Sequence, residues 1–243
     1  MDGSPVAATK ALGHVALTYV VPADNSALAI EGVLSALASR LDGRDAEAIV
    51  VENGSTDGTG ALRSAKGMGN AYRAGIAASR GARVVLTADD LPFGFDDLEA
   101  AEGVDPVVHP VVVGSKGHRD SDADRALLRG VLSRGFWALR RVVPGMRTLD
   151  SQGRFVLGSD WARRIGPQLT EPGYLGTTEL CFLAERLGAQ PLEVPVRLSP
   201  EHRDHRSRVT VRDVRQMAVG LWGIRRRHVP SVRDGVPDAP VQR

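Results

Sequence analysis

The sequence feature that most constrains the fold is an alternation of apolar, β-rich runs with segments of helical spacing. Apolar runs occur at 15–21, 48–51 and 83–87, and each is followed by a polar loop. Between the first two runs, apolar residues recur at helical spacing over 27–41. Consecutive parallel strands need crossovers of this kind, which are usually helices that cover the sheet. The pattern therefore predicts an α/β fold with a mostly parallel, Rossmann-like sheet and helices on both faces.

The remaining sequence continues this pattern without an internal repeat or a linker. Its spacing predicts further strands at 107–113 and 192–198 and helices at 123–143, 175–187 and 210–227. We expect a single domain over residues 14–228. It is flanked by a flexible N-terminus at 1–13 and by a flexible tail at 229–243, which carries prolines and few apolar residues.

Cysteine content and hydropathy set the expected location of the protein. Cys181 is the only cysteine, so no disulfide can form within the chain, which suits a reducing compartment. No run approaches the ~18 apolar residues of a membrane span. We expect a cytoplasmic protein with at most peripheral contact at the inner face of a membrane, and no nucleic-acid partner. The sequence leaves the oligomeric state open.

Three polar loops, at 23–26, 52–57 and 88–90, follow the first three predicted strands. In an open parallel sheet ligands bind beyond the carboxyl ends of the strands, so we expect these loops to share one crevice. Asp89 and Asp90 are adjacent carboxylates that repel each other unless a cation compensates them. Their hard oxygen ligands suit Mg²⁺ or Mn²⁺, which bridge carboxylates and substrate phosphates. An exposed acidic turn is the alternative that these residues leave open.

Taken together, these motifs resemble the family-2 glycosyltransferases of the GT-A fold. The similar segments are VVENGSTDGT at 50–59 (family VVDDGSTDGT), KGMGNAYRAG at 66–75 (KGxGxAxRxG), ADDL at 88–91 (DADL), GSK at 114–116 (GSR), DSQ at 150–152 (DTQ), ELCFLAER at 179–186 (ELLYLAER) and SRV at 207–209 (SKV). They follow the family's order from about residue 15 to about residue 227. The sequence is most similar to the subgroup of dolichyl- or polyprenyl-phosphate mannosyl- and glucosyltransferases.

The resemblance implies a nucleotide-sugar donor, of the GDP-mannose or UDP-hexose type, and a divalent metal ion. Asp90 would bind the ion, a Mg²⁺ or Mn²⁺ that acts as a Lewis acid toward the leaving nucleotide. The residues implied in donor binding are Pro22, Ala23, Asn25, Glu52, Asn53, Lys66, Asp89, Asp90 and Gln152. Arg206 and Arg208 would clamp the diphosphate from a loop that closes over it.

On the acceptor side, the resemblance implies transfer to a polyprenyl phosphate by a metal-assisted inverting mechanism. Lys116, Arg129 and Ser133 match positions that hold the acceptor phosphate in the lipid-phosphate enzymes. Arg129 and Ser133 are four residues apart on a predicted helix and so share a face. Glu179 matches a carboxylate that faces the acceptor. It would be the catalytic base for an alcohol acceptor, whereas an acceptor phosphate is already ionised near neutral pH.

Two alternatives to this function remain open. One is transfer to a small soluble acceptor, favoured by the absence of a membrane span and by the altered nucleoside loop at 22–26. The other is a catalytically inert nucleotide-binding protein that kept the fold, because Ala88 replaces the first Asp of the metal motif. A Rossmann-type oxidoreductase is disfavoured, because no G-x-G-x-x-G follows the first predicted strand.

Overall fold

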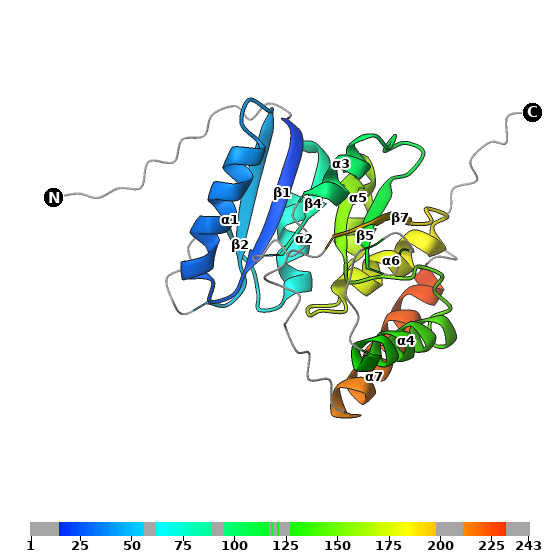
Figure 1. Ribbon diagram of the computed structural model, residues 1–243. Coiled ribbons are helices and arrows are strands. Elements are labelled where there is room, and N and C mark those ends of the chain that lie inside the picture. The colour runs from blue at the N-terminus through cyan, green and yellow to red at the C-terminus, as the bar shows by residue number, and fades with distance from the viewer. Residues whose placement is uncertain are drawn as a thin grey trace, which may run out of the picture.

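The computed structural model describes residues 15–55, 62–88, 95–116, 118, 121, 127–197 and 211–231. In chain order its elements are β1 (Val15–Ala23), α1 (Ala27–Arg40), β2 (Ala46–Glu52), β3 (Leu62–Arg63), α2 (Met68–Ala78), β4 (Gly81–Leu86), α3 (Asp96–Glu102), β5 (Val111–Ser115), α4 (Leu127–Val142), β6 (Arg154–Gly158), α5 (Ser159–Ile165), the 3-10 turn η1 (Gly166–Gln168), α6 (Gly176–Arg186), β7 (Leu192–Pro195) and α7 (Val211–Ser231) (Figure 1).

One seven-stranded sheet runs through the molecule in the order β3-β2-β1-β4-β6-β5-β7. β1 pairs in parallel with β2 and β4, and β5 pairs in parallel with β7. β6 is antiparallel to both of its neighbours, β4 and β5. The predicted fold class is confirmed: the chain forms a single α/β domain with a mostly parallel central sheet.

Helices cover both faces of the sheet. Successive strand residues point to opposite faces, so their side chains belong to two separate hydrophobic cores. One core joins the sheet to α1 and α3, and the other joins it to α2, α5, α6 and α7. Phe136 and Leu139 of α4 pack against the second core. α4 and α7 lie against each other at one end of the molecule (Figure 1).

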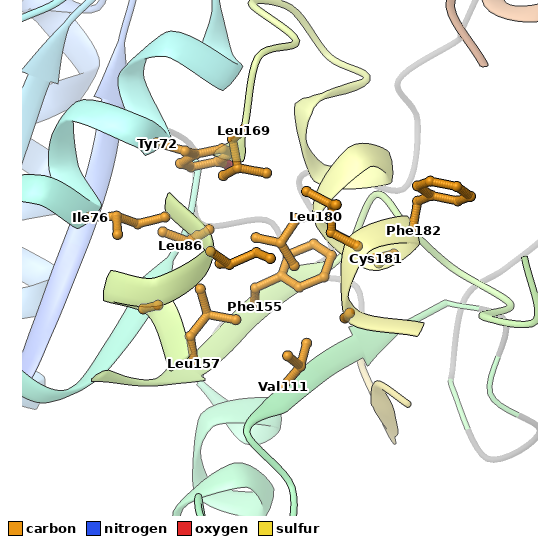
Figure 2. Close-up of a cluster of buried hydrophobic side chains, with 14 of the residues drawn as sticks. Tyr72, Ile76, Leu86, Val111, Phe155, Leu157, Leu169, Leu180, Cys181 and Phe182 are labelled. Carbon is orange, nitrogen blue, oxygen red and sulfur yellow. The ribbon is translucent and has the colours of Figure 1, made fainter. Parts of the chain in front are cut away.

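The larger core holds the end of β4 in place. Figure 2 shows Leu86 of β4 and Phe155 of β6 within one cluster that also contains Tyr72 of α2 and Leu180 of α6. The buried Tyr72 hydroxyl donates a hydrogen bond to the Thr87 carbonyl at 3.0 Å. Thr87, the residue that follows β4, is therefore held in place by α2.

The sequence misplaced or missed several elements. The strand predicted at 107–113 begins only at Val111, and the side chains of Val107 and Val108 are exposed in a turn between two prolines. β6, α3 and α5 were not predicted, because each has only five to seven residues and no long periodic pattern. α7 continues to Ser231, past the predicted start of the tail, whereas 1–13 and 232–243 lie outside the described residues.

Among the described helices, none combines the length and the hydrophobicity that crossing a membrane requires.

Candidate functional site

The ends of neighbouring strands form one edge of the sheet, which we call the carboxyl edge. β1, β2, β4 and β5 leave the sheet there, and the antiparallel β6 enters it there. The residues at these ends are Asn53, Ala23, Thr87, Gln152 and Lys116, in the order of the strands β2, β1, β4, β6 and β5. Segments from both halves of the chain therefore meet at this edge. Ligands of open α/β sheets bind beyond the carboxyl ends of the strands, which is this location.

The loops after β1 and β2 are joined directly. Ala23 and Glu52 are register partners at the ends of the two strands, and the Asn53 N–H donates to the Ala23 carbonyl at 3.1 Å. The Asn25 N–H donates to the Ser55 hydroxyl oxygen at 3.0 Å. Two of the three predicted loops are thus brought together. The third, at 88–90, is described only as far as Ala88.

Glu52 shapes the loop that it begins. Its carboxylate accepts hydrogen bonds from the Gly54 N–H at 2.5 Å and from the Ser55 N–H. These two bonds, of which the one from Ser55 has the larger effect, hold the pKa of Glu52 below its ordinary value. The carboxylate therefore stays ionised. Gly54 has φ +114°, and a Cβ there would lie 3.3 Å from the Cβ of Lys66. The stem of Lys66 therefore lies against this turn, as part of the same site.

Within the part of the chain that the structure describes, two buried oxygens at the carboxyl edge have no hydrogen-bond partner. They are Oδ1 of Asn53, which is 5% exposed, and Oγ1 of Thr87, which is 2% exposed. A buried polar atom without a partner costs about 1–3 kcal/mol, so such atoms are usually paired with water or with a ligand. Both follow the strands that flank β1. They mark a place where a polar ligand would be favoured.

Glycines at the start of α2 allow a close approach to the segment 171–173. A Cβ on Gly67 would lie 2.2 Å from the Pro172 carbonyl oxygen, and one on Gly69 would lie 2.1 Å from the Glu171 carbonyl oxygen. The Asn70 N–H donates to the Pro172 carbonyl at 3.2 Å. The Gly-x-Gly of the KGMG motif is therefore needed for contact between two backbones.

A Gly69→Ala variant is expected to be destabilised by about 1–3 kcal/mol, because the added methyl group must displace backbone. The melting temperature should fall by several degrees. Gly32→Ala is the matched control, since Gly32 lies inside α1 and a methyl group added there would meet no atom within 4 Å. That variant should be stabilised slightly, because alanine favours helices. Equal melting temperatures for Gly69→Ala and the wild type would contradict the packing argument.

The 150–152 turn precedes β6 and is hydrogen-bonded to the residue that follows β5 at the carboxyl edge. Asp150 accepts hydrogen bonds from the Lys116 N–H and the Gln152 N–H, both at 2.9 Å. The Gln152 side-chain amide donates to the Tyr174 carbonyl at 3.1 Å and to the Thr178 hydroxyl at 3.2 Å. Gln152 and Lys116 are therefore adjacent along this edge. Asp150 is the residue that holds them there, a role that the sequence did not indicate.

Glu179, the predicted catalytic residue, lies in the interior and is held there by several hydrogen bonds. Its carboxylate is 0% exposed and accepts hydrogen bonds from the Thr170 N–H (2.8 Å), the Thr170 hydroxyl (2.7 Å) and the Glu171 N–H (2.7 Å). Oε1 also lies 2.7 Å from Nε2 of His228. Burial acts to raise the pKa of Glu179, but the bonds from His228, Glu171 and Thr170 outweigh it and lower the pKa. A catalytic base must reach the proton that it removes, so the catalytic role of Glu179 stays a prediction.

The other predicted site residues are placed only in part by the structure. Pro22 and Ala23 are buried in β1 and Asn25 is exposed, but Asp89, Asp90, Arg206 and Arg208 lie outside the described residues. Arg129 and Ser133 lie in α4, where the structure describes the backbone but not these side chains. Among the described residues there is no group of three potential metal ligands.

Comparison with known proteins gives one informative sequence match. No protein-family model matches the sequence. The sequence is 26% identical to a dolichyl-phosphate β-glucosyltransferase of Dictyostelium discoideum, over 76% of this chain and 67% of that protein. The predicted resemblance to family-2 glycosyltransferases of the dolichyl-phosphate subgroup is thereby confirmed.

Solved structures with the same fold come from glucosyl-3-phosphoglycerate synthase of Mycobacterium tuberculosis. Its complex with UDP has a TM-score of 0.61 and 22% identity, covering 86% of this chain and 80% of that chain. Its complex with Mn²⁺, UDP and glucosyl-3-phosphoglycerate has a TM-score of 0.56 and 22% identity, covering 93% and 82%. At this level of identity the match establishes the fold.

Proposed function

We propose that this protein is a glycosyltransferase that transfers a sugar from a nucleotide-sugar donor to a phosphorylated acceptor. The observation that carries the proposal is the meeting of Asn53, Thr87, Lys66 and Gln152 at or beside one sheet edge. The similarity to a glucosyltransferase in sequence and to a glucosyl-transferring synthase in fold supports it.

The described residues fit the nucleotide part of such a donor. Among the described residues, Asn53 Oδ1 and Thr87 Oγ1 are buried acceptors that receive no hydrogen bond. N–H or O–H groups of a nucleoside can donate one to each. Lys66 stands next to the Asn53–Gly54 turn and carries a positive charge that suits the donor. The similar synthase was crystallised with UDP, which supports a uridine nucleotide as the first candidate to test.

Asp90 would hold a divalent ion, with Asp89 beside it in the donor site. They directly follow Thr87 and Ala88 at the end of β4, and carboxylate oxygens are ligands that Mg²⁺ and Mn²⁺ prefer. When bound, the ion would offset negative charge on the leaving diphosphate. Complexes of the similar synthase with Mn²⁺ or Mg²⁺ and UDP support this assignment. Arg206 and Arg208 remain the proposed diphosphate clamp.

A phosphate on the acceptor is supported by both relatives. One is named for dolichyl phosphate, and the other was crystallised with phosphoglyceric acid. We propose a polyprenyl phosphate held by Lys116, Arg129 and Ser133. Val219 and Trp222 of α7 have large exposed apolar side chains, which suit peripheral contact with a lipid surface at the inner face of a membrane. A small phosphorylated metabolite is the second candidate, favoured by the fold match with the synthase.

A thermal-stability screen with nucleotide sugars tests the donor assignment. UDP-glucose or GDP-mannose at 100 times its dissociation constant should stabilise the protein by about 2.7 kcal/mol in the presence of Mn²⁺. Transfer of labelled sugar to dolichyl phosphate in detergent, or to 3-phosphoglycerate, then identifies the acceptor. Stabilisation without transfer to any acceptor would favour the inert nucleotide-binding alternative. No stabilisation by any nucleotide sugar would contradict the proposal.

An Asn53→Leu variant should separate ligand binding from stability. Leucine has a similar shape and removes Oδ1, which makes no hydrogen bond to any of the described residues. The melting temperature should therefore change little, whereas nucleotide affinity should fall by roughly tenfold through the lost hydrogen bond. Calorimetric titration with UDP measures the second effect. Wild-type affinity in this variant would remove Asn53 from the donor site.

A further inference from the structure

The last turns of α7 form polar contacts both with α6 and with the segment before α6. His228 is buried, and its Nε2 lies 2.7 Å from Oε1 of Glu179 in α6. The adjacent Arg227 forms an ion pair with Glu171, at 2.7 Å between Nη2 and Oε2, and lies 3.8 Å from Oε1 of Glu179. α7 is thereby bonded both to α6 and to the segment that precedes it.

Glu179 links α7 to the segment 169–173, because its carboxylate is bonded to both. Three of the bonds to its carboxylate come from Thr170 and Glu171, so the backbone of this segment is fixed by a buried carboxylate. A fully buried carboxylate is stable only while its partners remain in place, because an unpaired buried charge is costly. Loss of His228 would therefore affect the segment and not only the helix.

The segment in turn fixes the amino end of α2. The Leu169 carbonyl accepts a hydrogen bond from Arg73 at 3.0 Å, and the Pro172 carbonyl accepts one from the Asn70 N–H at 3.2 Å. The contacts of Gly67 and Gly69 with Glu171 and Pro172 leave no room for either side to shift independently. Lys66 is the residue before Gly67 and lies against Gly54 at the carboxyl edge.

We propose that Arg227 and His228 are positioning residues for the donor site. They act through Glu179 and Glu171 on the segment 169–173, which sets the place of the α2 amino end and of Lys66. The inference rests on the proposed function, because it assigns a donor to the carboxyl edge. It gives Glu179 a role in the architecture of the site, in addition to the chemical role that its motif predicts.

Arg227→Ala and Arg226→Ala form a matched pair for the test. The two arginines are neighbours on α7, but Arg226 lies over the Trp222 ring and Arg227 contacts Glu171. Arg227→Ala should increase amide hydrogen exchange at Thr170, Glu171 and Asn70 and raise the KM for the nucleotide sugar by roughly tenfold, with kcat nearly unchanged. Arg226→Ala should leave exchange and KM as in the wild type.

His228→Gln should recover much of what His228→Ala loses, because the glutamine amide can donate to Glu179. If His228→Ala does not fold, the comparison of Arg227→Ala with Arg226→Ala tests the inference alone. The Arg227 side chain is 42% exposed, so its removal leaves no buried cavity. A normal KM in Arg227→Ala, with or without faster exchange at Glu171, would overturn the inference. Failure of the proposed function is seen separately, as a wild-type protein that binds no nucleotide sugar.

Discussion

Replacing Asp90 with alanine is expected to abolish metal-dependent nucleotide binding and to reduce sugar transfer on the order of a thousandfold. The loss follows from removing a ligand of the ion that would offset charge on the diphosphate, an effect worth several kcal/mol. Titration of UDP into the variant, with Mn²⁺ and with EDTA, measures the binding term. The two curves should coincide in the variant and differ in the wild type.

Asp89→Ala should have the smaller effect, because Asp90 is the proposed metal ligand. Asp42→Ala is the control for a general loss of negative charge, since Asp42 is exposed in the turn before β2, at the opposite end of the strands. It should bind and transfer like the wild type. Equal UDP affinity of the wild type in Mn²⁺ and in EDTA would exclude the metal role.

The second large effect is expected from Arg129→Ala. If Arg129 holds an acceptor phosphate, donor affinity should persist while transfer falls. Charge-assisted hydrogen bonds contribute roughly 1.5–3 kcal/mol, which corresponds to a loss of about 10- to 150-fold. The measurement is transfer at saturating donor, with the acceptor concentration varied. Lys116→Ala and Ser133→Ala should show losses of the same kind.

Arg141→Ala is the matched control for Arg129→Ala, because Arg141 is exposed in the last turn of the same helix, α4. It should transfer sugar at the wild-type rate. Under the alcohol-acceptor alternative, Arg129→Ala should matter little. Glu179→Gln cannot settle that question by itself, because the buried carboxylate has four partners and its replacement should also lower stability.

The fold could be predicted because its signal is local. Apolar runs ending in polar loops identified β1, β2 and β4, since buried parallel strands are apolar on both sides. The same criterion failed before β5, where two valines between Pro106 and Pro110 are as apolar as a strand but remain in a turn. Residue type alone does not show where pairing begins.

The site could be predicted only in part, for a different physical reason. Motif order located the loops around Asn53 and Gln152, which the sheet brings to one edge. The position of Glu179 depends on His228, which is far along the chain in a separate helix. The holding role of Asp150 depends likewise on Lys116, from another strand end. Such contacts between distant segments leave no periodic pattern in either segment.

The antiparallel β6 has a consequence for the order of folding. On one side of it lie β1, β2 and β4, which all come from the first part of the chain and pair in parallel. The ladder of β4 with β6 joins Leu86 to Phe155 across a stretch about as long as the one that separates β1 from β4, so loop entropy does not set the order of these two ladders. During synthesis, however, the nucleotide-facing half emerges first, and it is therefore expected to assemble before the half that carries Gln152 and Lys116. A nascent chain would acquire its two binding regions in succession, and the β4–β6 ladder would unite them together with the contacts of α2 with the segment 169–173.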